Sequence, residues 1–170
     1  MPELLILRHG ESGHSFSGDD HGRTLTQHGQ DQARVVGRWL LRSGHLPDST
    51  ICSDAMRTRQ TCIWVNHELG EKAPTPYLDQ RLYLAAPQSM LSIINEVPET
   101  VQSLLVVAHM PGVQELSMSL ASAQSQEDPV IQMAGSWPPA GIARFQLDKP
   151  WAELDGRDAE LTDFFTADRV

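Results

Sequence analysis

Short apolar runs alternate with amphipathic segments along this chain. Apolar runs bounded by polar residues predict strands over residues 3–8, 50–52, 103–108, 142–147 and 159–165, with the last of these at an edge of the sheet. Because strands and helices alternate, we expect an α/β fold. It should be a three-layer sandwich whose central sheet is mostly parallel and covered by helices on both faces.

The helices are predicted from apolar spacing and from residues that start or stop a helix. Apolar residues between positions 33 and 41 recur at i, i+3, i+4, i+7 and i+8, which is one face of a helix. Thr26 is the expected N-cap of this helix, and Gly44 ends it. A second helix is expected to begin with Ser53 or Asp54 as its cap and to end at Gly70.

Two further helices follow, and prolines mark where they start. Pro87 suits the first turn of a helix that ends before Pro98, and Pro111 opens another helix. Residues 122–139 are rich in Ser, Gln and Pro, so we expect a loop there.

Size and composition indicate one globular domain over residues 1–170. The apolar runs are too short to span a bilayer, and the first residues lack the basic leader of a secretory signal. Cys52 and Cys62 are read as small core residues in a reducing compartment rather than as a disulfide. We therefore expect a cytoplasmic protein.

The net charge of −9 and the pI near 5.1 limit the possible partners. An acidic surface repels nucleic acids and anionic membranes, so neither is expected as a partner. A protein of this kind that binds an anion must concentrate its positive charge in one cleft.

Two predicted strands end in histidines. Arg8, His9 and Gly10 follow the run at residues 3–8, and His109 follows the run at residues 103–108. Ligands of open α/β sheets bind outside the carboxyl ends of the strands. This placement predicts a pocket for an anion that contains a nucleophile.

Five segments, in order along the chain, resemble the motifs of the histidine phosphatase superfamily, which has the phosphoglycerate-mutase-like fold. The resemblance is to its short phosphohistidine phosphatases. The matching segments are RHGE at residues 8–11, DxxRTLTxxG at 20–29, SDAMRxxQT at 53–61, VVAHMPG at 106–112 and LxxFxT at 161–166.

The resemblance implies that His9 is the nucleophile and that Arg8, Arg57 and His109 bind the phosphoryl group. Arg23 either contacts the phosphate or is an ion-pair partner of Asp20. No metal or cofactor is implied, because arginines can stabilise the charge on the three equatorial oxygens of the transferring group. The nucleophile must attack as a neutral imidazole, and neighbouring arginines should lower its pKa.

The chain departs from the family pattern near the pocket. Ala108 and Met110 replace a usual Gly and Asn, and Leu84 stands where many relatives carry a Glu that protonates the leaving oxygen. An alkoxide is a poor leaving group without such an acid, whereas the imidazole of phosphohistidine leaves easily. Phosphohistidine in a protein is therefore the expected substrate. Asp79 and Glu11 are weak alternative acids, and Glu11 is expected instead to orient an arginine.

Other functions stay open on the sequence alone. The chain could be a phosphomonoesterase for a small phosphorylated metabolite or a non-catalytic phosphoprotein-binding module, whereas a mutase would need longer insertions. The partner is accordingly a phosphorylated protein or a small phosphorylated molecule. The sequence does not fix the oligomeric state, and a monomer is favoured.

Histidines and tryptophans outside these motifs are given structural interpretations. His14, His21 and His28 recur every seven residues, but without a known ligand motif we expect a solvated loop and helix start rather than a metal site. The tryptophans are expected in packing roles, and Trp137 in the sequence SWPP could border the pocket.

Overall fold

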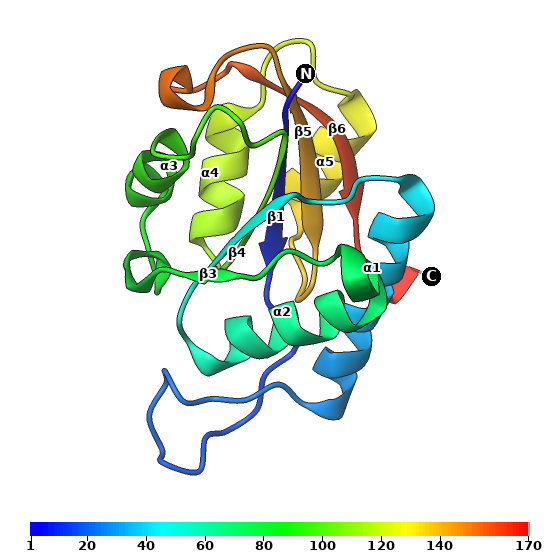
Figure 1. Ribbon diagram of the computed structural model, residues 1–170, viewed down its shortest axis with the longest axis vertical. Helices are drawn as coiled ribbons and strands as arrows, with labels where there is room; N and C mark the ends of the chain where they lie inside the picture. Colours follow the sequence, from blue (N-terminus) through cyan, green and yellow to red (C-terminus); the bar gives the residue numbers. More distant parts are fainter. Residues whose placement is uncertain (170) are drawn as a thin grey trace.

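The computed structural model describes residues 1–169 and shows a six-stranded sheet between two layers of helices (Figure 1). The strands are β1 (Glu3–Arg8), β2 (Ser49–Cys52), β3 (Tyr77–Leu78), β4 (Ser103–Ala108), β5 (Ile142–Leu147) and β6 (Ala159–Phe165). The helices are α1 (Gln27–Ser43), α2 (Met56–Leu69), α3 (Pro87–Asn95), α4 (Gly112–Leu120) and α5 (Glu127–Gly135).

The sheet is mostly parallel, which confirms the prediction. Its strand order is β3-β2-β4-β1-β5-β6. The pairs β3–β2, β2–β4 and β4–β1 are parallel, whereas β5 runs antiparallel to both β1 and β6. In the β1–β4 pair Arg8 lies opposite Ala108, so the residues that follow the two strands leave the sheet side by side.

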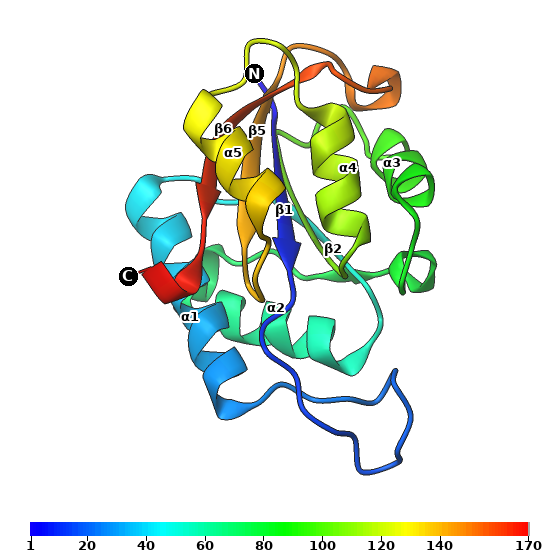
Figure 2. The ribbon, with the colours of Figure 1, turned by 180° about the vertical axis from the view of Figure 1, so that it is seen from behind.

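Side chains of the central strands alternate between two apolar cores. In β1, Leu4 and Ile6 belong to a core with residues of α3, α4 and α5, while Leu5 and Leu7 belong to a core with residues of α1 and α2. This alternation follows from the two-residue period of a strand. It produces the three predicted layers, with helices on both faces of the sheet as Figures 1 and 2 show.

The ends of α1 agree with the sequence prediction. The Thr26 side chain accepts a hydrogen bond of 3.0 Å from the backbone N–H of Gly29, as an N-cap does. Gly44 has a φ of 77° and ends the helix in the left-handed conformation that glycine adopts without strain.

Two predictions about helices were wrong. Residues 127–135 form helix α5 inside the expected loop at 122–139, with Glu127 and Asp128 in the first turn. Helix α2 has Ala55 at its N-cap with no capping side chain, not Ser53 or Asp54. The Ser53 hydroxyl bonds to His109 and also accepts from the backbone N–H of Ala55, and the Asp54 carboxylate bonds to His21.

Both cysteines are free and buried, as predicted. In residues 1–169 no helix combines the length and apolar character that a membrane crossing requires.

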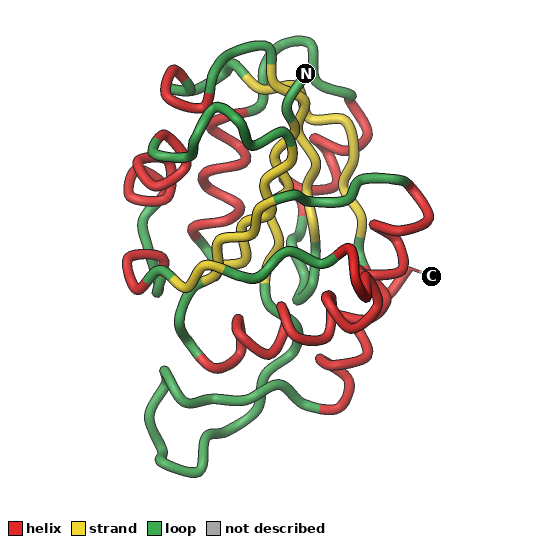
Figure 3. Tube along the Cα trace, in the orientation of Figure 1, coloured by secondary structure: helices red, strands yellow, loops and turns green. Residues whose placement is uncertain are grey.

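The connection from β1 to α1 extends beyond the carboxyl end of the sheet. It projects as an extended loop at the bottom of Figure 1, and the tube in Figure 3 shows it without helix or strand. A bridge between Ser12 and Leu25 closes its base. This loop carries Asp20 and Arg23 toward the end of the sheet where the two strand-end histidines lie.

Candidate active site

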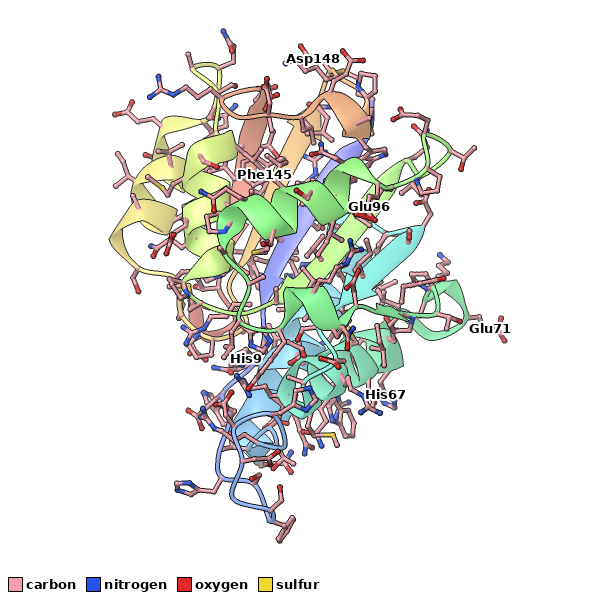
Figure 4. The ribbon with its side chains drawn as sticks, turned by 90° about the vertical axis from the view of Figure 1, so that its left-hand side faces the viewer. His9, His67, Glu71, Glu96, Phe145 and Asp148 are labelled. Carbon is pink, nitrogen blue, oxygen red and sulfur yellow. The ribbon has the colours of Figure 1, made fainter. Side chains whose placement is uncertain are left out.

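One pocket at the carboxyl end of the sheet brings together the four residues that the sequence singled out. Arg8, His9, Arg57 and His109 all line a cavity of about 300 Å³. The ring centroids of His9 and His109 are 5.4 Å apart. Figure 4 shows His9 at the end of the sheet opposite Asp148. The cavity, here called the His9 pocket, is also lined by Ser12, Asp20, Arg23, Leu84 and Met110.

The hydrogen bond of His9 fixes which ring nitrogen can attack. Its Nδ1 lies 2.7 Å from the backbone carbonyl oxygen of Gly10. A carbonyl oxygen only accepts, so Nδ1 carries the proton and Nε2 keeps its lone pair. The pKa of His9 is lowered from 6.5 to about 4, first by burial and then by the positive charge of neighbouring arginines, against an opposing effect of the Gly10 bond. The ring is therefore neutral at physiological pH.

Gly10 holds the strand end against the two helices on this side. Its N–H donates to the Thr61 hydroxyl in α2 at 3.1 Å. A Cβ at this position would lie 2.6 Å from the backbone oxygen of Gly29 in α1. The close approach requires glycine here and fixes the backbone that carries His9.

His109 is supported from strand β2. Its Nε2 shares a hydrogen bond of 2.8 Å with the hydroxyl of Ser53, the residue after β2. The pKa of His109 is lowered from 6.5 to about 3, mainly by burial and then by the charges of His9 and Arg57. His109 therefore contributes the single N–H of a neutral ring, and protonation is not needed for it to donate one hydrogen bond.

Two arginines are held by backbone carbonyl groups. The Arg8 Nη1 donates to the carbonyl oxygen of Trp137 at 2.7 Å, and the Arg57 Nη1 donates to that of Asp20 at 2.8 Å. Arg57 is the second residue of α2, so the N-terminal end of the helix dipole also favours an anion beside it. Trp137 is buried and contributes to the site through its backbone.

Two buried side-chain nitrogens of residues that line the His9 pocket have no protein partner in the described part of the chain. They are Nε of Arg8 and Nδ1 of His109. A buried polar group without a partner is costly, and native proteins rarely retain one without a reason. Both atoms belong to residues that line the pocket, so an oxyanion is a fitting partner for them.

Arg23 forms the ion pair with Asp20 that the sequence analysis considered, and it also lies at the pocket. It lines the His9 pocket, and its Nη1 lies 3.2 Å from the Asp20 carboxylate. Its Nε donates to the carbonyl oxygen of Gly13 and its Nη2 to the hydroxyl of Ser12, at 2.9 Å each. These bonds tie Arg23 to the base of the projecting loop.

The weaker acid candidates do not reach the reacting centre. Asp79 bonds to Arg81, which lowers the pKa of the carboxyl, and it lines hollows beside β3 instead of the His9 pocket. The expectation that Glu11 orients an arginine was wrong, because its carboxylate accepts from the Thr26 hydroxyl at 2.8 Å. Leu84 lines the pocket with an apolar side chain and a φ of 50°.

Sequence reasoning missed the residues that support the site. Ser53 was read as a helix cap, although its place directly after β2, next to the strand that ends at His109, was a usable signal. Tyr83 donates to the Asp20 carboxylate, and its ring packs edge-to-face with that of His109. The Trp137 carbonyl could not be found from residue type, because every residue carries one.

His14, His21 and His28, which are spaced by seven residues, form no common site. His21 bonds to Asp54 at 3.1 Å, and His28 lies 3.4 Å from Asp168. Within residues 1–169 no group of three or more His, Cys, Asp or Glu side chains is arranged to hold a metal ion.

Known proteins are similar to this chain in sequence and in fold. A model of the histidine phosphatase superfamily (branch 1) matches residues 4–82. An uncharacterized protein of Mycobacterium tuberculosis is 34% identical over 159 residues, which cover 93% of this chain and 98% of the relative. A phosphohistidine phosphatase SixA homolog of Haemophilus influenzae is 29% identical over 167 residues, which cover 89% of this chain and 92% of the homolog.

A solved structure extends the match to the whole fold. The structure of a proposed phosphohistidine phosphatase SixA of Nakamurella multipartitia has a TM-score of 0.83 and 26% identity, covering 96% of this chain and 95% of the other. The chain belongs to the histidine phosphatase superfamily, with the phosphoglycerate-mutase-like fold. Within it, the chain falls in the SixA-like subgroup and is a phosphatase.

Proposed function

We propose that this phosphatase acts on phosphohistidine in a protein, with His9 as the nucleophile and a phosphohistidine enzyme intermediate. The observation that carries the proposal is the 2.7 Å contact between His9 Nδ1 and the Gly10 carbonyl, which leaves the Nε2 lone pair for attack. Arg8, Arg57, His109 and Arg23 hold the phosphoryl oxygens.

The first step transfers the phosphoryl group to the enzyme. His9 Nε2 forms a bond to phosphorus while the phosphorus–nitrogen bond of the substrate breaks, and the substrate imidazole takes its proton from solvent. We assign the ring proton of His109 to Nδ1, with the Ser53 hydroxyl donating to Nε2, so that Nδ1 and the unpartnered Arg8 Nε both donate to equatorial oxygens. Donors placed in advance around a developing charge are the main source of rate in phosphoryl transfer.

The second step releases the phosphate. A water oxygen attacks phosphorus in line, the bond to His9 Nε2 breaks, and inorganic phosphate and neutral His9 are formed. The lowered pKa of His9 supports this step, because a ring that binds protons weakly is a good leaving group. Arginine charge serves both steps, so the chemistry proposed here needs no metal.

The residue at the pocket mouth favours imidazole as the leaving group. Leu84 occupies the position of the acid that many relatives use, and its side chain is exposed beside the pocket. An alkoxide needs a proton as it departs, and Leu84 has none to give. The similarity to the SixA homolog of Haemophilus influenzae, which is named a phosphohistidine phosphatase, supports the same substrate class.

Turnover of two substrate types tests the proposal. A protein phosphorylated on histidine and a simple alkyl phosphate should be compared at the same concentration, with phosphate release as the readout. We expect faster release from phosphohistidine. Faster release from the alkyl ester would reject this substrate class and favour a phosphomonoesterase for a small metabolite.

A further inference from the structure

The carboxylate of Asp20 occupies arginine donors inside the His9 pocket. Its Oδ2 accepts from Arg57 Nη2 at 3.1 Å, and its Oδ1 accepts from Arg23 Nη1 at 3.2 Å. The Tyr83 hydroxyl donates to the same carboxylate. One side chain therefore connects α2, the projecting loop and the segment that follows the short helical turn η2 (Gln80–Leu82).

The Asp20 carboxylate is a negative charge in a pocket whose other charged lining groups are positive. Three arginines line the pocket, and Asp20 is the single carboxylate among its lining residues in the described chain. The hydrogen bond from Tyr83, together with Arg57 and Arg23, lowers the pKa of Asp20 to about 2, so the group stays ionised. A carboxylate and a phosphoryl group present similar oxygens to a guanidinium.

We propose that Asp20 is an internal competitor for the oxyanion, sharing the Arg57 and Arg23 donors with the phosphoryl group and weakening the hold of the pocket on the phosphate product. The proposal rests on the function proposed above and adds a residue that sets its turnover.

Weak binding of the product is useful in this site. Inorganic phosphate carries the same oxygens as the transferring group, and the arginines that stabilise the transition state would also retain the product. Equal binding of ground state and transition state does not speed the chemical step. A fixed negative charge beside Arg57 and Arg23 offsets part of that retention.

A purely structural role for the carboxylate would predict the opposite effect. If the carboxylate served only to orient Arg57, its removal would loosen the arginine and weaken anion binding. However, the Asp20 backbone carbonyl also accepts from Arg57 Nη1, at 2.8 Å, and a side-chain substitution keeps that bond. Side chain and backbone can therefore be tested separately.

The test is the dissociation constant of inorganic phosphate, measured by titration calorimetry on the full chain. In Asp20→Asn the charge is lost while an acceptor oxygen stays. We expect phosphate to bind to this variant on the order of tenfold more tightly than to the natural protein. Coulomb's law gives an effect of about this size when one unit charge is removed about 6 Å from a dianion in water. Product inhibition by phosphate should strengthen by a similar factor.

Asp19→Asn is the matched control, since it removes the same charge one residue away. The Asp19 carboxylate bonds to Ser15 and Ser17 on the exposed side of the loop. Phosphate affinity should change less than twofold in this variant. Asp20→Ser, which is shorter, provides a second test if Asp20→Asn folds poorly.

Unchanged or weaker phosphate binding in both Asp20 variants would overturn the proposal, as would equal tightening in Asp19→Asn. Failure to detect phosphate binding to any of these proteins would also overturn it. Because binding is measured at equilibrium without turnover, the outcome is separate from that of the substrate comparison, which tests the proposed function.

Discussion

The hydroxyl of Ser53 lies 2.8 Å from Nε2 of His109, so the residue after β2 supports the histidine after β4. The two strands are paired in the sheet, and Val107 lies opposite Cys52. The register of the sheet therefore positions the imidazole of His109 through a bond between neighbouring strand ends.

Replacing Ser53 with Ala removes this support. We expect kcat to fall about tenfold with little change in KM, because the His109 ring loses its hydrogen bond and its orientation while the arginines still bind the substrate. Ser103→Ala is the control, since Ser103 is a buried serine at the other end of β4. A similar loss of kcat in both variants would show that packing, not the bond to His109, is responsible.

Arg57→Lys keeps the positive charge and removes the planar fork. We expect kcat/KM to fall by about 10²–10³, because a single ammonium group cannot both keep the two bonds that Arg57 makes to Asp20 and donate to the transferring group. The neighbouring Arg59 is exposed on the same helix, so Arg59→Lys should retain nearly full activity. Steady-state kinetics on phosphohistidine would measure both, and an active Arg57→Lys enzyme would contradict the role given to the fork.

Leu84→Glu introduces an acid at the pocket mouth. We expect turnover of an alkyl phosphate to rise relative to turnover of phosphohistidine, because the new carboxyl can protonate a leaving alkoxide. Leu84→Gln, of similar shape but without a titratable proton, is the matched control. Equal changes in both variants would show that polarity at this position matters and proton donation does not.

The strand-end histidines should titrate well below the usual value. Ring proton NMR of the phosphate-free protein is expected to give a midpoint near 4 for His9 and near 3 for His109. Because the unfolded chain binds these protons near pH 6.5 and the folded chain does not, the free energy of unfolding should decrease as the pH falls from 6.5 toward 4. The slope is at most about 1.4 kcal/mol per pH unit for each histidine. Midpoints near 6.5 would contradict the burial of the two rings.

Five of the six strands and the four central pocket residues were predicted from the sequence, whereas the two-residue strand β3 was not. Buried apolar runs that end in Arg8, His9 and His109 place these groups at the carboxyl ends of strands, and parallel pairing of β1 with β4 brings them together. Arg57 was predicted from the resemblance of residues 53–61 to a family motif, and its place in the first turn of α2 agrees with that role.

Other features leave a weak signal or none. Helix α5 buries one residue, Met133, so residues 122–139 show no clear apolar face. Ser53 and Asp54 are residue types that often cap helices, but here their side chains bond to His109 and His21, which are distant in sequence. The loop that carries Asp20 into the pocket depends on long-range hydrogen bonds, which local sequence pattern does not specify.

The nucleophile is tested most directly by trapping the enzyme intermediate. The protein should be quenched in base within one turnover of a ³²P-labelled phosphohistidine substrate, because phosphohistidine survives base and is hydrolysed in acid. The account predicts an acid-labile label on a peptide that contains His9, and neither label nor turnover in His9→Ala. Label on another residue, or full turnover in His9→Ala, would contradict it.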